Sequence, residues 1–120
     1  MSVLESRRPF RLPEAPERSD LMAKYFRGFG DPTRVRILEL LRAEGELSVG
    51  ELVERLGEPQ PKVSNHLACL RWCGFVTAQR EHRTVLNRIA DPRVTEMLDL
   101  AHALLAANAE RVAACCRIDA

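Results

Sequence analysis

The chain has 120 residues, which suits one domain with a modest core that a partner chain would help to complete. Its composition is that of an ordinary globular protein, with 46% hydrophobic and 29% charged residues and a net charge of +1. No apolar run approaches the roughly 20 residues of a membrane-spanning helix, and the N-terminus lacks the apolar stretch of a secretory signal. We therefore expect a cytoplasmic protein, in which four cysteines favour thiolate ligands, redox groups or small core residues over a disulfide framework.

The charge is unevenly divided along the chain. Residues 60–88 carry five basic side chains and one acidic side chain, a net charge of +4, whereas residues 31–57 carry four basic and six acidic ones, a net charge of −2. Such a basic segment is what an anionic partner requires, although a solvated surface can have the same composition.

The first elements are an arm and two helices. Residues 1–17 contain three prolines and no helical periodicity, which predicts a flexible N-terminal arm. Apolar residues at spacings of three and four predict a short amphipathic helix over 18–30. Asp31 as N-cap and Pro32 in the first turn begin the clearest helix, which Gly45 ends.

Two more helices follow in quick succession. Ser48 and Glu51 form a capping-box pattern at the start of a short helix that ends at Gly57. Pro61 fits the first turn of the next helix, and Gly74 ends it. The core face of this second helix consists of Val63, Leu67 and Leu70.

The remaining segments predict a hairpin and a long helix. Period-two alternation over 75–89 indicates two strands that turn near Glu81 and His82, because histidine tolerates a positive φ better than most residues. Asp91 and Pro92 then begin an Ala-rich helix. Its apolar side consists of Val94, Met97, Leu98, Ala101, Leu105 and Val112. This order predicts a mainly α protein with a β-hairpin wing, a winged helix-turn-helix.

Several stretches resemble one known family. "DPTRVRILELL", "GELSVGELVERLG" and "PQPKVSNHLACLRWCGFV" are similar to the ArsR/SmtB metal-responsive repressors over roughly residues 20–115. The resemblance implies a homodimer of winged helices, paired through their outer helices, that represses operons from operator DNA and releases it when metal binds. It places the DNA-binding and dimerisation domain at residues 18–116 and a C-terminal tail at 117–120.

Two metal sites known in the family are missing here. The arsenic-type site needs cysteines where "ELSVGEL" has Ser48 and Gly50. The zinc-type site of the last helix needs a histidine where this chain has Arg93, and its later ligand positions fall near Leu104 and Ala107.

A third pattern is present. "HLACLRWCG" resembles the H-L-x-C-L-x-x-C-G element of cadmium- and lead-sensing members, which implies that Cys69 and Cys73 bind metal together with Cys115 or Cys116, one of which takes the role of the tail cysteine in those members. Residues four apart lie on one side of a helix, and sulfur-only ligand sets favour soft ions, here Cd, Pb or possibly Hg.

Other roles for these side chains stay open. A free cysteine often simply fills space in a core, but a pair four apart together with a vicinal pair favours ligands. His66 lies on the same flank and could supply a nitrogen ligand, although the V-S-x-H-L element favours a structural role. His102, in the last helix, suits the surface or dimer packing.

The DNA contacts are expected at the start of the cysteine-bearing helix and on the wing. The residues that we expect to read bases in the major groove are Gln60, Lys62, Ser64 and Asn65. The residues that we expect to hold phosphates are Arg71, Arg80 and Arg83.

Three alternative functions are weighed against this one. The same repressor could respond to As(III), Hg(II) or thiol oxidation instead. A DNA-independent dimeric adaptor could use the winged fold for protein contacts. An enzyme with Cys69 or Cys73 as nucleophile and His66 as base is disfavoured, because no oxyanion-forming glycine turn is present and residues on one helix rarely reach the geometry required.

Overall fold

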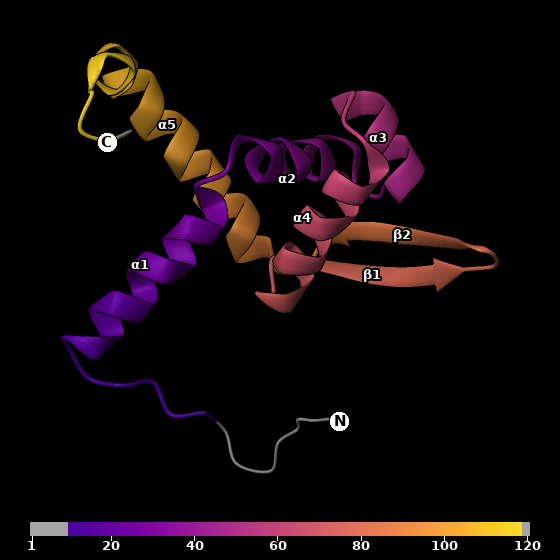
Figure 1. Ribbon diagram of the computed structural model, residues 1–120, viewed down its shortest axis with the longest axis horizontal. Helices are drawn as coiled ribbons and strands as arrows, with labels where there is room; N and C mark the ends of the chain where they lie inside the picture. Colours follow the sequence, from indigo (N-terminus) through magenta and orange to yellow (C-terminus); the bar gives the residue numbers. More distant parts are fainter. Residues whose placement is uncertain (1–9, 119–120) are drawn as a thin grey trace.

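The computed structural model describes residues 10–118 and has the element order predicted from the sequence (Figure 1). Its elements are α1 (Glu17–Phe29), α2 (Pro32–Glu44), α3 (Val49–Leu56), α4 (Gln60–Trp72), β1 (Val76–Glu81), β2 (Thr84–Ile89) and α5 (Pro92–Ala114). Most of the expected arm, residues 1–9, lies outside the described residues, and α1 begins one residue earlier than expected. The flexibility of the arm stays a prediction.

The predicted caps are confirmed. The Oδ1 atom of Asp31 accepts hydrogen bonds from the backbone N–H of Thr33 at 2.8 Å and of the next residue at 3.2 Å. Ser48 and Glu51 form the complete reciprocal capping box. Asp91 caps α5 in the same way as Asp31 caps α2. These side chains satisfy N–H groups that the first helical turn leaves without partners.

The wing is a two-stranded antiparallel hairpin, as predicted. The pairing runs from Val76 opposite Ile89 to Glu81 opposite Thr84, and His82 in the turn has a φ of 58°. The hairpin extends away from the helices and presents its turn as a projecting tip (Figure 1).

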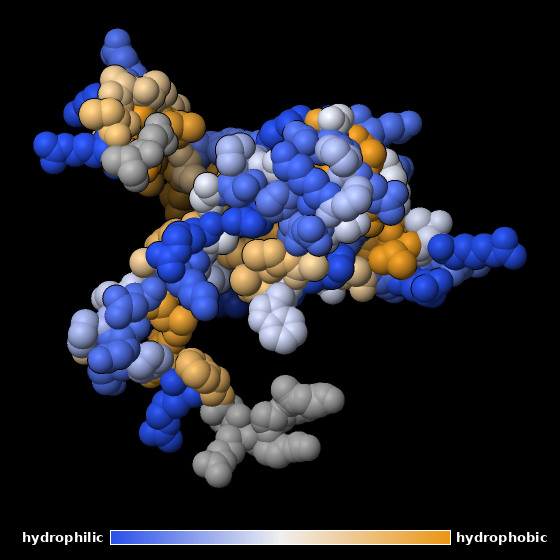
Figure 2. All heavy atoms as spheres, viewed as in Figure 1, coloured by the Kyte–Doolittle hydropathy of each residue, from blue (hydrophilic) through white to orange (hydrophobic). Residues whose placement is uncertain are grey.

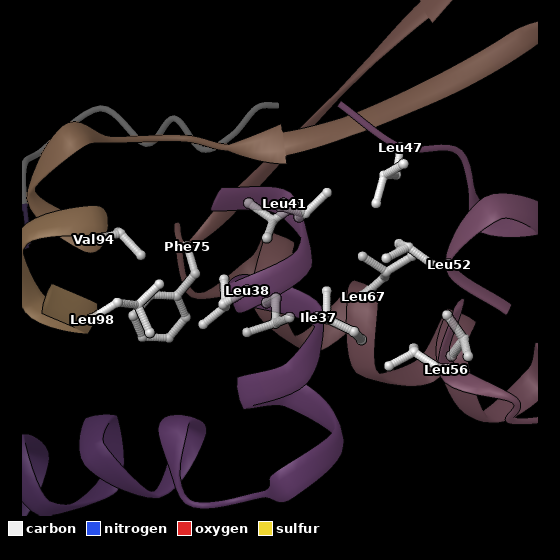
Figure 3. Packing of buried hydrophobic residues seen from close by; sticks show 13 residues of the cluster. Ile37, Leu38, Leu41, Leu47, Leu52, Leu56, Leu67, Phe75, Val94 and Leu98 are labelled. Atoms are coloured by element: carbon white, nitrogen blue, oxygen red, sulfur yellow. The ribbon is translucent and has the colours of Figure 1, made fainter. Parts of the chain in front are cut away.

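The core lies between α2, α3, α4 and the base of the wing. Its members share near-complete burial and are Ile37, Leu38, Leu41, Leu47, Leu52, Leu56, Val63, Leu67, Leu70, Phe75, Val76, Val94 and Leu98. Figure 3 shows Phe75 beside Val94 and Leu98 of α5. The ring centroid of Phe75 also lies 4.6 Å from that of Phe29 and 4.9 Å from that of Tyr25, so one aromatic side chain fastens α1 to the end of α4.

The apolar side of α5 is only partly covered by its own chain. Val94 and Leu98 are buried as expected, but Leu105 and Val112 are exposed because α5 extends beyond the core (Figure 1). In Figure 2, hydrophobic side chains reach the surface over α5 and along one side of α1. Among residues 10–118, no helix combines the length and the apolar character that crossing a bilayer requires.

Candidate functional site

Helix α4 combines a buried face with an exposed N-terminal end. Val63, Leu67 and Leu70 are fully buried, which fixes the orientation of the helix. The expected base-reading positions lie at its start, where Gln60, Lys62 and Asn65 are exposed and Ser64 is half-buried. This end of α4 is therefore accessible to a large ligand such as a nucleic-acid duplex.

The basic side chains expected to hold phosphates differ in their surroundings. Arg80 and Arg83 are exposed on the wing. The Nη1 atom of Arg71 donates a hydrogen bond to Oδ1 of Asn87 at 3.3 Å, so this guanidinium ties α4 to the wing. Lys62, of the base-reading set, also has a partner, since its Nζ donates to a Glu58 carboxylate oxygen at 3.0 Å.

Sequence reasoning missed the role of Asn87. Its side chain is fully buried in β2, and its Nδ2 donates to the carbonyl oxygen of Leu47 at 3.1 Å. Asparagine is disfavoured in strands, so its presence in an otherwise regular strand was the signal for a specific hydrogen-bonding role. Because it contacts both Leu47 and Arg71, Asn87 holds the base of the wing against α4.

Two of the four cysteines expected to bind metal lie together near the C-terminal end of α4. Cys69 is half-buried, and Cys73, the C-cap residue, is exposed. Burial and the neighbouring Cys69 thiol raise the pKa of Cys73, an effect that the positive charges of Arg34 and Lys24 oppose. A pair of adjacent soft donors fits a thiophilic metal ion, which would displace the thiol protons on binding.

The other two thiols lie elsewhere in the single chain. Cys115 caps the C-terminal end of α5, with Cys116 next to it. Figure 1 shows that this end lies well away from the C-terminal end of α4. Within the part of the chain that the structure describes, no three metal-ligating side chains cluster together. One protomer thus offers the α4 pair without a third thiol beside it.

The two candidate histidines have polar partners. The Nδ1 atom of His66 lies 3.3 Å from Nη1 of Arg34, and its Nε2 lies 3.8 Å from Oδ1 of Asp31. A guanidinium only donates hydrogen bonds, so Nδ1 accepts and Nε2 carries the ring hydrogen. His102 contacts a Glu39 carboxylate oxygen at 2.9 Å, which joins α5 to α2 at the surface. Both arrangements fit the structural roles expected from the sequence.

Tyr25 is a further neighbour of the thiol pair that sequence reasoning missed. Burial, followed by the nearby Cys73 thiol and the Asp91 carboxylate, raises the pKa of the Tyr25 phenol. The α1 helix that carries Tyr25 therefore passes close to the cysteine-bearing end of α4. No feature of the sequence alone pairs these two helices.

Comparison with known proteins gives a consistent result. The model of the family described as "Bacterial regulatory protein, arsR family" matches residues 31–78. A probable mercury resistance operon repressor from Streptomyces lividans is 41% identical over 99 residues, which cover 82% of this chain and 78% of that protein. The transcriptional regulator CmtR from Mycobacterium tuberculosis is 39% identical over 95 residues, which cover 78% of this chain and 80% of that protein.

A solved structure has the same architecture. The homodimeric winged helix-turn-helix DNA-binding domain of a possible ArsR-family regulator from Mycobacterium bovis matches with a TM-score of 0.65 and 26% identity. The match covers 78% of this chain and 89% of that one. These similarities confirm the winged-helix fold and the family resemblance predicted from the sequence.

Proposed function

Because this chain belongs to the ArsR family of bacterial regulatory proteins, we propose that it is a repressor that leaves operator DNA when a soft metal ion binds its thiols. The proposed ions are Cd, Pb or Hg. The observation that carries the proposal is the pairing of Cys69 and Cys73 on one flank of α4, the helix whose exposed start is suited to the major groove.

The shape and charge of the molecule support DNA binding. The exposed start of α4 and nearly all of the projecting wing belong to residues 60–88, the segment that carries a net charge of +4. Arg80 and Arg83, exposed on the wing, can contact phosphates, which supplies affinity, while Gln60 and Asn65 can pair with base edges, which supplies specificity.

Exposed apolar side chains on α1 and α5 support a homodimer. They are Leu21, Met22, Tyr25, Phe26, Leu100, Leu104, Leu105 and Val112. A groove of about 440 Å³ between the same helices and α2 is lined largely by apolar residues, including Phe26, Phe29, Met97 and Leu104. Monomeric proteins rarely expose so continuous an apolar surface, and the Mycobacterium bovis relative is described as homodimeric.

The choice of ions follows from the donors. Sulfur ligands select soft ions, and a cytoplasmic setting would keep these thiols reduced. The relative from Streptomyces lividans is described as a probable mercury resistance operon repressor, which supports a thiophilic inducer. Two sulfurs leave such an ion under-coordinated. The proposed third ligand is Cys115 or Cys116, and the distance between the helix ends within one chain favours the tail of the partner protomer.

The energetic coupling required is modest. A coupling free energy of about 1–3 kcal/mol, typical of allosteric proteins, changes DNA affinity roughly 5- to 150-fold. The ion would supply only the bonds that hold the thiolates together, while the protein supplies the resulting displacement of α4.

The central test uses Cd(II) and a duplex that the metal-free protein selects from a random-sequence pool, referred to below as the selected duplex. Ultraviolet sulfur-to-metal absorption reports metal binding, and fluorescence anisotropy reports DNA release. We expect a Cys69→Ser/Cys73→Ser protein to bind the selected duplex normally but to show neither the absorption nor the release. If that variant still binds Cd(II) and still leaves the duplex, the assignment is wrong.

Mixed dimers test the origin of the tail ligand. One protomer carries Cys69→Ser and Cys73→Ser, and the other carries Cys115→Ser and Cys116→Ser. If the tail crosses between protomers, the mixed dimer regains one complete site, whereas each parent dimer has none. Titrations with Pb(II), Hg(II), As(III) and hydrogen peroxide on the wild-type protein then separate metal sensing from the arsenic and redox alternatives.

A further inference from the structure

Arg34 of α2 makes contacts that join three helices. Its Nε donates to the carbonyl oxygen of Gly28 at 2.8 Å and its Nη2 donates to that of Arg27 at 3.2 Å, so it binds the last turn of α1. Its third nitrogen, Nη1, donates to Nδ1 of His66 on α4 at 3.3 Å. One half-buried guanidinium therefore holds the end of α1 and the flank of α4 at the same time.

This junction lies directly beside the thiol pair. His66 precedes Cys69 by three residues, so the two side chains are neighbours on the same flank of α4. Arg34 is close enough to Cys73 for its positive charge to act on that thiol. Any displacement of α4 that gathers the two cysteines and a third thiol around one ion consequently acts on the contact between His66 and Arg34.

The other end of the junction leads to the proposed dimer surface. The last turn of α1, which Arg34 binds, follows the exposed apolar residues Met22, Tyr25 and Phe26 on the same helix. If α1 pairs with the partner protomer, a change in its angle relative to α4 changes the spacing of the two recognition helices. Half-sites of an operator lie about one helical turn of DNA apart, so that spacing controls affinity.

We propose that Arg34 and His66 are positioning residues that couple occupation of the Cys69/Cys73 site to the placement of α1 and thereby to operator affinity. The inference rests on the proposed function and deepens it, because it names the connection through which the site acts. His66 is neither a metal ligand nor a base-reading residue in this scheme, since its Nδ1 is bonded to Arg34 and its Nε2 faces Asp31.

The test compares two substitutions of His66. His66→Ala removes the acceptor, whereas His66→Asn places an amide oxygen near the position of Nδ1 and can accept from Arg34. Each variant is titrated with Cd(II), followed by sulfur-to-metal absorption, and its affinity for the selected duplex is measured with and without Cd(II). Ring ¹⁵N chemical shifts of the metal-free wild-type protein should also show that the neutral His66 ring carries its hydrogen on Nε2; a hydrogen on Nδ1 would contradict the contact with Arg34.

We expect all three proteins to bind Cd(II) with equal stoichiometry. Cd(II) should weaken DNA binding by a factor within the roughly 5- to 150-fold range in the wild-type protein and in His66→Asn, but by less than about threefold in His66→Ala. An unchanged factor in His66→Ala overturns the inference, and so does loss of Cd(II) binding in it, which would make His66 part of the ligand set.

Arg34→Lys provides an independent measurement if His66→Ala fails to fold. Lysine keeps the positive charge but cannot donate to three acceptors in the planar arrangement of a guanidinium. It should lose coupling while keeping Cd(II) absorption, and retention of full coupling overturns the inference. Failure of the proposed function itself has a different signature, because then the wild-type protein shows no release by Cd(II) at all.

Discussion

Replacement of Phe75 by alanine should be among the most destabilising single substitutions in this protein. The side chain is only 1% exposed and contacts α1 through the rings of Tyr25 and Phe29. A buried phenylalanine removes roughly 150–250 Å² from water, worth about 4–6 kcal/mol at ~25 cal/mol per Å², and measured Phe→Ala losses are about 3–5 kcal/mol. Stabilities of about 5–15 kcal/mol are typical, so a large share would be lost.

The measurement is urea denaturation followed by far-ultraviolet circular dichroism, at one fixed protein concentration because the proposed dimerisation would contribute to stability. Trp72→Ala is the matched control: it removes a larger aromatic side chain three residues earlier, but that side chain is 92% exposed and should matter by no more than about 0.5 kcal/mol. A loss below about 1.5 kcal/mol for Phe75→Ala, or equal losses for the two variants, would refute the view that Phe75 fastens α1 to the core.

Three further predictions concern charges. The Arg93 side chain lowers the pKa of Asp91 to about 2 from 3.8, so the ionised Asp91 stabilises the folded state above pH 4 and this contribution is lost as the pH falls through 2. The difference in unfolding free energy between wild type and Asp91→Asn should therefore shrink over that interval. The pKa of the Cys73 thiol is raised, so this thiol is protonated at pH 7, and Cd(II) affinity measured by absorption should increase steadily from pH 6 to 9. Glu58→Gln releases Lys62 from its ion pair, so the ammonium can contact the DNA and binding should tighten; an unchanged affinity would show that Lys62 does not contact the DNA.

The predictable part of the fold consists of features encoded by residues close together in the chain. Asp31, Ser48 and Asp91 cap helices through backbone groups two or three residues away, and their side-chain chemistry alone indicates the helix starts. The core face of α4 follows in the same way from a spacing of three and four, and the turn at His82 from the conformations that histidine tolerates.

The features that the sequence did not predict depend on residues far apart in the chain. Asn87 contacts Leu47, forty residues earlier, and Arg34 contacts His66, thirty-two residues later. Neither contact leaves a periodic pattern, because each depends on how whole helices pack. Cys69 and Cys73 could be paired because they are four residues apart, whereas the position of the tail thiols depends on where α5 ends and, in the proposal, on a second chain.

The placement of the two proposed binding regions on α4 determines what kind of switch this protein can be. Asn65 and Cys73 are eight residues apart, which corresponds to about 12 Å along a helix, and the thiols lie on a flank different from the buried face. An ion bound there does not occupy the space of a base pair, so it cannot displace DNA by competition.

Release must come from a change in the orientation of α4 or in the spacing between the two copies of α4 in the proposed dimer. The core resists bending of α4 itself, since Val63, Leu67 and Leu70 are fully buried, so spacing between protomers is the softer variable. A metal-loaded dimer should therefore keep the packing of α4 on the core of each protomer while the placement of α1 changes. It should lose affinity most strongly for duplexes whose two half-sites are held at the original separation, while affinity for a single half-site changes little.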